Sequence, residues 1–142
     1  MYAKFSKYQF WLSKVAFLRH IVSNKGVSVD HQKIEAVTNW PRSKNPAEGR
    51  SCLGMVGYYR RFVQNFSKIA TPLTNLARKV VKYEWREQCE GVFQELKKRL
   101  TSVPILALLT ADKDFMVYSD VSRSGLGCVL IQEGHLIAYA SR

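Results

Sequence analysis

The sequence is poor in cysteine and histidine, and neither set has the spacing of a structural site. The three cysteines and three histidines are scattered along the chain: Cys52, Cys89 and Cys128, and His20, His31 and His135. An odd number of distant cysteines excludes a disulfide framework, and no close ligand pairs are present for zinc. We therefore expect an intracellular, reducing compartment, with cytoplasm and nucleus left open.

Long hydrophobic runs are also missing. No stretch of about 18 apolar residues occurs, which excludes a membrane-spanning helix. The first thirty residues mix charges with aromatics and lack the apolar run of a secretory signal. The hydrophobic fraction of 46% over 142 residues is still enough for one ordinary domain or two small ones. We expect no membrane partner.

Acidic residues are scarce in the first half of the chain. Residues 1–78 carry 13 lysines and arginines against 3 acidic residues, whereas residues 103–142 carry 3 against 4. The net charge of +11 therefore belongs mostly to the first half. This asymmetry indicates a polyanionic partner, with nucleic acid preferred over a membrane surface. Charge alone leaves open a basic protein that has no such site.

The N-terminal segment has strand character. Residues 8–22 are rich in aromatic and β-branched residues, which predicts a strand, a kink near Ser13–Lys14 and a second strand. A turn at residues 23–26, in which Gly26 can adopt positive φ, leads into a return strand. Asp30 is a predicted N-cap for a short helix that ends before Pro41.

A long helix is predicted from Asn45, as its cap, to about Asn65. At 100° per residue an apolar face, predicted to be core, comprises Cys52, Met55, Val56, Tyr59, Phe62, Val63 and Phe66. The opposite face comprises Arg50, Gly54, Gly57, Tyr58 and Arg61, with Arg60 at its edge. A helical glycine costs about 1 kcal/mol relative to alanine. The two glycines of this opposite face indicate close approach of another backbone or a duplex. The alternative is a solvated basic face.

The remainder of the chain changes from helix to strand. A short helix is predicted to start at Thr71–Pro72, and an amphipathic helix to cover residues 86–102. Strands are predicted at 115–119, 125–131 and 135–140, as an antiparallel meander that begins a sheet. The predicted fold class is α+β: a β-hairpin, a small helical bundle and then the first antiparallel strands of an incomplete sheet.

Six segments follow one another along the chain: FWLSKVAFLRHIVSNKGVSVD, WP, RSCLGMVGYYRRFVQNFSKIATPLT, LKKRL, YSDVSRSGLGCVL and IAYASR. In this order they resemble the Pol polyprotein of gypsy-class LTR retrotransposons. The resemblance implies that residues 1–78 are the end of a reverse-transcriptase palm, with a primer-grip-like hairpin, and thumb-like helices. It implies that residues 79–142 are the connection segment and the truncated N-terminal part of an RNase H-like domain.

The resemblance also implies nucleic-acid contacts. Phe17, Leu18 and His20 match the hairpin that grips the primer strand, although Phe17 and Leu18 could equally serve hydrophobic packing. The family usually has glycine in the place of Arg19, and this departure puts the grip in doubt.

The long predicted helix matches the thumb helix that follows the minor groove of the template–primer duplex. Arg50, Gly54 and Tyr58 lie on that track, and Arg60 and Arg61 would contact phosphates, which fix position and not sequence. The expected partner is an RNA–DNA hybrid or a DNA duplex, bound without sequence specificity.

Asp120, in YSD, matches the family's first RNase H carboxylate, which binds Mg²⁺ in the intact parent enzyme together with later acidic residues. A two-metal site needs several carboxylates, and we expect the others to lie beyond Arg142. No Asp-Asp pair occurs for the polymerase centre. We therefore expect a chain with both catalytic centres incomplete and no cofactor of its own, in which Asp120 could equally be a capping or surface group.

These observations favour a fragment of a reverse transcriptase/RNase H polyprotein that retains nonspecific duplex binding. The alternatives are a domesticated basic module that binds nucleic acid and a subunit that docks on an intact polymerase. The sequence leaves the oligomeric state open.

Overall fold

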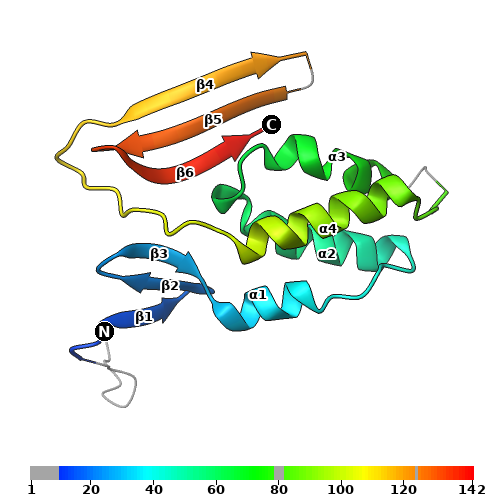
Figure 1. The fold of residues 1–142 in the computed structure, drawn as a ribbon, viewed down its shortest axis with the longest axis horizontal. Helices are drawn as coiled ribbons and strands as arrows, with labels where there is room; N and C mark the ends of the chain where they lie inside the picture. The colour runs from blue at the N-terminus through cyan, green and yellow to red at the C-terminus, as the bar shows by residue number, and fades with distance from the viewer. Residues whose placement is uncertain (1–9, 79–81, 124) are drawn as a thin grey trace, which may run out of the picture.

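A computed structural model describes residues 10–78, 82–123 and 125–142. Its elements, in chain order, are β1 (Lys14–Phe17), β2 (His20–Ser23), β3 (Gly26–Val29), α1 (His31–Thr38), α2 (Pro46–Tyr58), the 3₁₀ turn η2 (Arg60–Phe62), α3 (Phe66–Leu76), α4 (Glu87–Thr101), β4 (Met116–Ser122), β5 (Gly125–Gln132) and β6 (His135–Ser141). Figure 1 shows two small sheets, one above the other, and a group of helices beside them. The predicted α+β class is confirmed.

The first sheet is antiparallel, in the order β1-β2-β3. Phe17 pairs with His20, so Leu18 and Arg19 alone form the turn between β1 and β2. The chain bends at Ser13, directly before β1, which agrees with the predicted kink near Ser13–Lys14. The predicted strands are wrong in extent: residues 10–12 form no strand, and the second predicted strand is divided by the turn at Leu18 and Arg19 into β1 and β2. Residues 8 and 9 of the predicted strand lie outside the described residues.

Gly26 joins the first sheet to the chain that follows α4. Its φ is +124°, which confirms the expected positive-φ turn. Val27 and Leu106 exchange two backbone hydrogen bonds, of 2.7 and 2.9 Å. A Cβ atom on Gly26 would lie 2.2 Å from the Leu106 carbonyl oxygen, so only glycine permits this approach.

The starts of α1 and α2 follow from local sequence. The Asp30 carboxylate accepts a hydrogen bond from the Gln32 backbone N–H, at 3.0 Å. The Asn45 side chain accepts from the Glu48 N–H at 2.9 Å, and Pro46 occupies the first turn. Both predicted caps are confirmed, because a cap needs only residues within one turn of it.

The predicted long helix is interrupted. α2 ends at Tyr58, Tyr59 leaves helical geometry at φ −96° and ψ 11°, and η2 follows. Asn65 then adopts a left-handed conformation, with φ +55°. The 3₁₀ turn allows Phe62 and Val63 to be buried beside Tyr59. Tertiary burial of these three side chains overrides continuation of the helix.

α3 begins earlier than predicted, at Phe66, and contains Pro72 in its interior. Proline at that position removes a hydrogen bond and crowds the preceding turn. The helix nevertheless buries a regular apolar face of Phe66, Ala70, Leu73 and Leu76. Burial of this face offsets the cost of the proline, so Thr71–Pro72 is not a helix start.

One hydrophobic core unites β3, the four helices and the connecting chain. α4 contributes the buried stripe Cys89, Phe93, Leu96 and Leu100, as its predicted amphipathic pattern requires. Burial raises the pKa of the Cys52 thiol in this core to about 11, against a smaller lowering by Lys97. Such a thiol remains protonated and unreactive at neutral pH. No helix in the described ranges is long and apolar enough to cross a bilayer.

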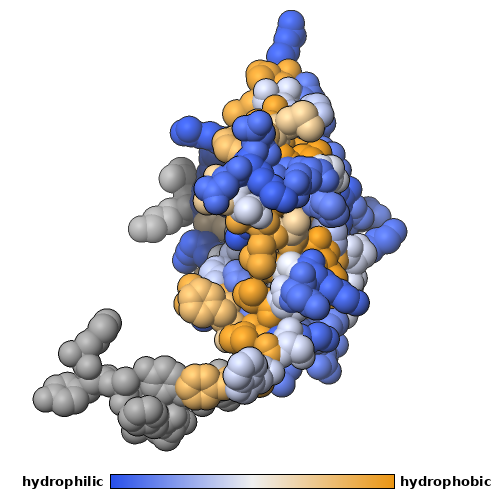
Figure 2. Space-filling view, turned by 90° about the vertical axis from the view of Figure 1, so that its left-hand side faces the viewer, coloured by the Kyte–Doolittle hydropathy of each residue, from blue (hydrophilic) through white to orange (hydrophobic). Residues whose placement is uncertain are grey.

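The second sheet is the predicted antiparallel meander, in the order β4-β5-β6. β6 lies toward the helices: the Ser67 backbone N–H donates to the Ser141 hydroxyl at 2.9 Å, and the Ser67 hydroxyl donates to the Ser141 carbonyl at 2.8 Å. β4 is the outermost strand in Figure 1, and all seven of its residues are exposed. Figure 2 shows hydrophobic side chains in a band down the end of the molecule where the connecting chain passes.

Leu106 is the side chain through which the connecting chain enters the core, with 0% exposure. We expect Leu106→Ala to lower the free energy of unfolding by about 3 kcal/mol, because it removes buried methyl groups and leaves a cavity. Urea unfolding followed by circular dichroism measures the change. Leu109→Ala is the matched control, since Leu109 is 55% exposed in the same segment and should change stability little. Equal effects of the two substitutions would refute this account.

Candidate nucleic-acid interface

The tip of the first hairpin is bound to the end of α2 by two neighbouring tyrosines. The Tyr58 hydroxyl donates to the Leu18 carbonyl, and the Tyr59 hydroxyl donates to the Arg19 carbonyl at 3.3 Å. Both turn residues have positive φ, +46° for Leu18 and +63° for Arg19. Such angles are unfavourable for residues with a Cβ. The tyrosine hydroxyls therefore hold a strained turn through its own carbonyl groups.

His20 packs the base of this tip against the helix. Its ring centroid lies 5.3 Å from that of Tyr58, 5.8 Å from Tyr59 and 5.7 Å from Phe62, with the Phe62 ring stacked at 23°. Its Nδ1 bonds to the Leu18 carbonyl at 2.8 Å. A carbonyl only accepts, so this bond requires the proton on Nδ1. The Nε2 atom is buried among these residues and has no hydrogen-bond partner in the described chain.

The two tyrosines divide between core and surface as the helical period predicts. Tyr59 is 2% exposed, whereas Tyr58 is 42% exposed. Burial, and then the neighbouring Tyr58, raise the pKa of the Tyr59 phenol. Tyr59 therefore stays protonated as a donor to the hairpin, and Tyr58 presents one side of its ring outward.

The tip residues themselves face solvent. Phe17, Leu18 and Arg19 are exposed, and the Arg19 guanidinium lies 5.7 Å from the centroid of the Tyr58 ring. Phe17 and Leu18 are thus not covered by packing within the described chain. Together with Tyr58 they present apolar and cationic groups on one exposed surface, which we call the tip surface (Phe17, Leu18, Arg19 and Tyr58).

Arg50 and Gly54 lie on the preceding turns of α2. Arg50 is exposed, but its guanidinium donates to the Ala77 carbonyl at 3.2 Å, where α3 ends. Gly54 is exposed, and a Cβ atom there would meet nothing within 4 Å. Packing within the described fold therefore gives no reason for glycine at this position.

Arg60 and Arg61 lie in η2 and not on the helix, because α2 ends before them. Arg61 donates to the Ile137 carbonyl of β6 at 3.5 Å. Arg60 is exposed, and its guanidinium makes no hydrogen bond or ion pair with the part of the chain that the structure describes. Arg60 is therefore the more available cation of the pair.

Asp120 is distant from the tip surface in sequence and lies in the middle of β4. It stands opposite Gly127 and is exposed. With Asn65, Lys68 and Arg142 it lines a polar hollow of about 110 Å³. Within the described ranges no three histidine, cysteine or acidic side chains come together as metal ligands. The residues present thus do not fit a Mg²⁺ pair, because Asp120 supplies a single carboxylate.

Two groups of hydrogen bonds could not be predicted from the sequence. The tyrosine–carbonyl bonds join residues 40 positions apart, and the Ser67–Ser141 bonds join residues 74 positions apart. Serine and tyrosine hydroxyls carry no spacing signal for such distant partners. Only the exposed face of Tyr58 had a local signal, in the helical period.

Comparison with known proteins identifies the family. Residues 85–142 match the RNase H-like domain found in reverse transcriptase. The chain is 34% identical over 140 residues to the retrovirus-related Pol polyprotein from transposon 412 of Drosophila melanogaster, covering 96% of this chain. The chain is homologous to part of the Pol polyproteins of retrotransposons. This confirms the resemblance read from the sequence motifs, and the gypsy class is consistent with the names of these relatives.

The match covers unequal shares of the relatives. The chain spans 11% of the transposon 412 polyprotein and 13% of that from transposon 297. An uncharacterized mitochondrial protein of Arabidopsis thaliana is 46% identical over 109 residues, which are 75% of this chain and 68% of that protein.

Solved structures show the same fold. The foamy viral protease-reverse transcriptase in complex with an RNA/DNA hybrid superposes with a TM-score of 0.84 at 23% identity, over 92% of this chain and 18% of that chain. The same viral protein in complex with double-stranded DNA gives a TM-score of 0.82, over 92% of this chain and 28% of that chain. The Pol fragment therefore has the architecture of the reverse transcriptase/RNase H region.

The strained turn generates a prediction about Arg19. We expect Arg19→Gly to raise the free energy of unfolding by about 1 kcal/mol, since glycine adopts positive φ without the steric cost of a Cβ. Urea unfolding measures the change. Lys25→Gly in the next turn is the control: its φ is not positive, and added backbone entropy should destabilise. Destabilisation by both substitutions would contradict the proposed strain at the tip.

Proposed function

We propose that this Pol fragment binds an RNA–DNA hybrid or a DNA duplex, without sequence specificity, through the tip surface, α2 and η2. The observation that carries the proposal is the attachment of the hairpin tip to the exposed side of α2. This attachment brings apolar and cationic groups together in the basic half of the chain. The viral proteins of the same fold, solved with a hybrid and with duplex DNA, support this choice of partner.

The proposed contacts divide by chemistry. Phe17, Leu18 and Tyr58 would pack against sugars and the primer backbone, while Gly54 allows the helix to approach the groove closely. His20 would not touch the duplex itself, but would position the turn at Leu18 and Arg19 through its contacts with that turn and with α2. Arg50, Arg60 and Arg61 would contact phosphates, with Arg60 the most available because the other two also bond to the fold. Phosphate contacts position a duplex and do not read its sequence.

The proposal also assigns a structural role to each of two parts of the chain. Residues 1–78 would supply the hairpin and thumb-like helices, and residues 79–142 the connection and the first strands of the RNase H-like domain. The parent family is an RNA-directed DNA polymerase with RNase H. We propose that the fragment alone catalyses neither reaction, because Asp120 has no partner carboxylates nearby in the described chain. Mg²⁺ would serve the intact parent enzyme.

Charge reversal tests the phosphate contacts. We expect fluorescence anisotropy with a labelled RNA–DNA hybrid to show binding that weakens log-linearly with salt, as counterions are released. The double variant Arg60→Glu with Arg61→Glu should abolish measurable binding. If weak binding remains, the slope of log affinity against log salt concentration should fall in magnitude by about 2. Circular dichroism of the same samples shows that both proteins are folded.

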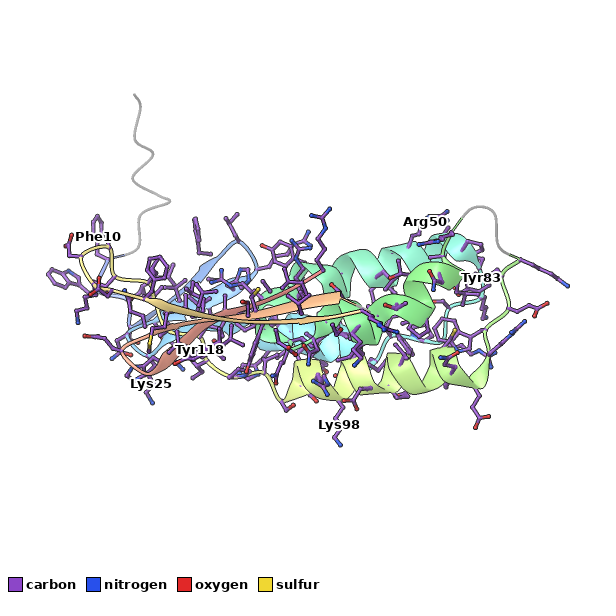
Figure 3. All side chains as sticks on the ribbon, turned by 90° about the horizontal axis from the view of Figure 1, so that it is seen from above. Phe10, Lys25, Arg50, Tyr83, Lys98 and Tyr118 are labelled. Carbon is purple, nitrogen blue, oxygen red and sulfur yellow. The ribbon has the colours of Figure 1, made fainter. Side chains whose placement is uncertain are left out.

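Lys98→Glu is the matched control, since Lys98 is exposed on α4 and points away from Arg50 (Figure 3). It should leave the affinity within about twofold, because one distant charge is largely screened at physiological salt. Equal loss in the control and the double variant would mean that overall charge, and not this surface, binds the duplex. Hybrid binding that is unchanged in the double variant would contradict the proposed phosphate contacts of Arg60 and Arg61.

A further inference from the structure

Arg19 has a backbone conformation that its own side chain makes unfavourable. Its φ is +63°, in the left-handed region that residues with a Cβ seldom adopt. Glycine would adopt this conformation without the steric cost. Strain that persists in a folded protein points to a functional contribution from the strained residue. Because Arg19 is exposed, that contribution has to come from what its side chain can bind outside the fold.

The guanidinium of Arg19 is not neutralised by the fold. It lies 5.7 Å from the centroid of the Tyr58 ring, and within the described ranges it has no carboxylate or carbonyl acceptor. A cation–π contact at an exposed site is weak, and it leaves the N–H donors of the guanidinium available to other acceptors. Arg19 is thus a cation that is held in place and still able to bind an anion.

The turn fixes the point from which this side chain extends. The Tyr59 hydroxyl donates to the Arg19 carbonyl at 3.3 Å, and Tyr59 itself is buried in the core. The Tyr58 hydroxyl holds the neighbouring Leu18 carbonyl, while the Tyr58 ring contacts the guanidinium. The backbone and the side chain of Arg19 are therefore both oriented before a ligand arrives, which lowers the ordering cost of binding.

We propose that Arg19 is a phosphate-binding residue, whose guanidinium leaves the Tyr58 ring to bind one backbone phosphate of the duplex. This inference rests on the proposed function of the tip surface. Phe17 and Leu18, which would pack against sugars, directly precede Arg19, so its side chain is placed beside the phosphates that flank those sugars. The planar fork of arginine matches two phosphate oxygens. The same exchange uncovers the Tyr58 ring for contact with a sugar.

A neutral substitution that keeps the backbone strain isolates the role of the side chain. With a labelled RNA–DNA hybrid, Arg19→Gln should reduce the slope of log affinity against log salt concentration by about 1 in magnitude, because one phosphate contact is lost. The affinity at low salt should fall about tenfold, as expected for one hydrogen-bonded charge. Arg19→Lys keeps the charge and should keep the slope, although it binds more weakly because an ammonium group lacks the fork.

Lys25→Gln is the matched control. Lys25 is an exposed cation in the turn at the opposite end of β2, so the net charge changes equally but away from the tip. This substitution should leave the affinity within about twofold, because a distant charge is largely screened at physiological salt. Equal effects of Arg19→Gln and Lys25→Gln would overturn the proposal, since the overall charge would then explain both.

The unaltered chain separates this inference from the proposed function. If that chain does not bind the hybrid, both are overturned. If it binds, and charge reversal at Arg60 and Arg61 abolishes binding while Arg19→Gln keeps the full slope and affinity, only the role of Arg19 is overturned.

Arg19→Gly gives a second readout, because stability and binding should change in opposite directions. The variant relieves the backbone strain, so its urea unfolding midpoint should rise. It also removes the guanidinium, so its affinity for the hybrid should fall together with the salt slope. A variant that is more stable and binds as tightly as the unaltered chain would show that Arg19 has no part in binding.

Discussion

Two hydroxyl groups on consecutive tyrosines determine how the first hairpin sits on the helices. Tyr58 and Tyr59 point in different directions from the end of α2, yet both donate to carbonyls of one two-residue turn. The turn has unfavourable backbone angles and cannot be expected to hold its shape alone. His20 fills the space beneath it with a ring that contacts three aromatic neighbours. Polar and aromatic contacts therefore combine to fix the part of the molecule that we propose touches the duplex.

Local signals in the sequence were reliable wherever the cause was local. The caps at Asp30 and Asn45, the turn at Gly26 and the amphipathic stripe of α4 all depend on residues within a turn or two, and all were predicted. The sheet of β4 to β6 was predicted for the same reason, since each hairpin pairs neighbouring segments. The side-chain periodicity also separated buried Tyr59 from exposed Tyr58.

Predictions failed where distant packing decided the outcome. α2 ends at Tyr58 because Phe62 and Val63 must reach the common core, a demand that the helical pattern alone does not reveal. α3 tolerates Pro72 because its buried face compensates. The turn at Leu18 and Arg19 lacks the glycine or asparagine that would signal a two-residue hairpin. For the candidate site, the family motifs indicated the residues, but only the structure shows that Arg50 and Arg61 also bond to the fold.

The most direct test of the account uses Tyr59, which is buried and cannot touch a duplex. Tyr59→Phe keeps the ring in the core and removes only the hydroxyl that holds the Arg19 carbonyl. If the tip must be positioned to bind, affinity of the folded variant for an RNA–DNA hybrid should fall about fivefold, the equivalent of one net hydrogen bond. An affinity equal to that of the unaltered chain, measured at the same salt concentration, would contradict the claim that the hairpin tip and α2 act as one binding surface.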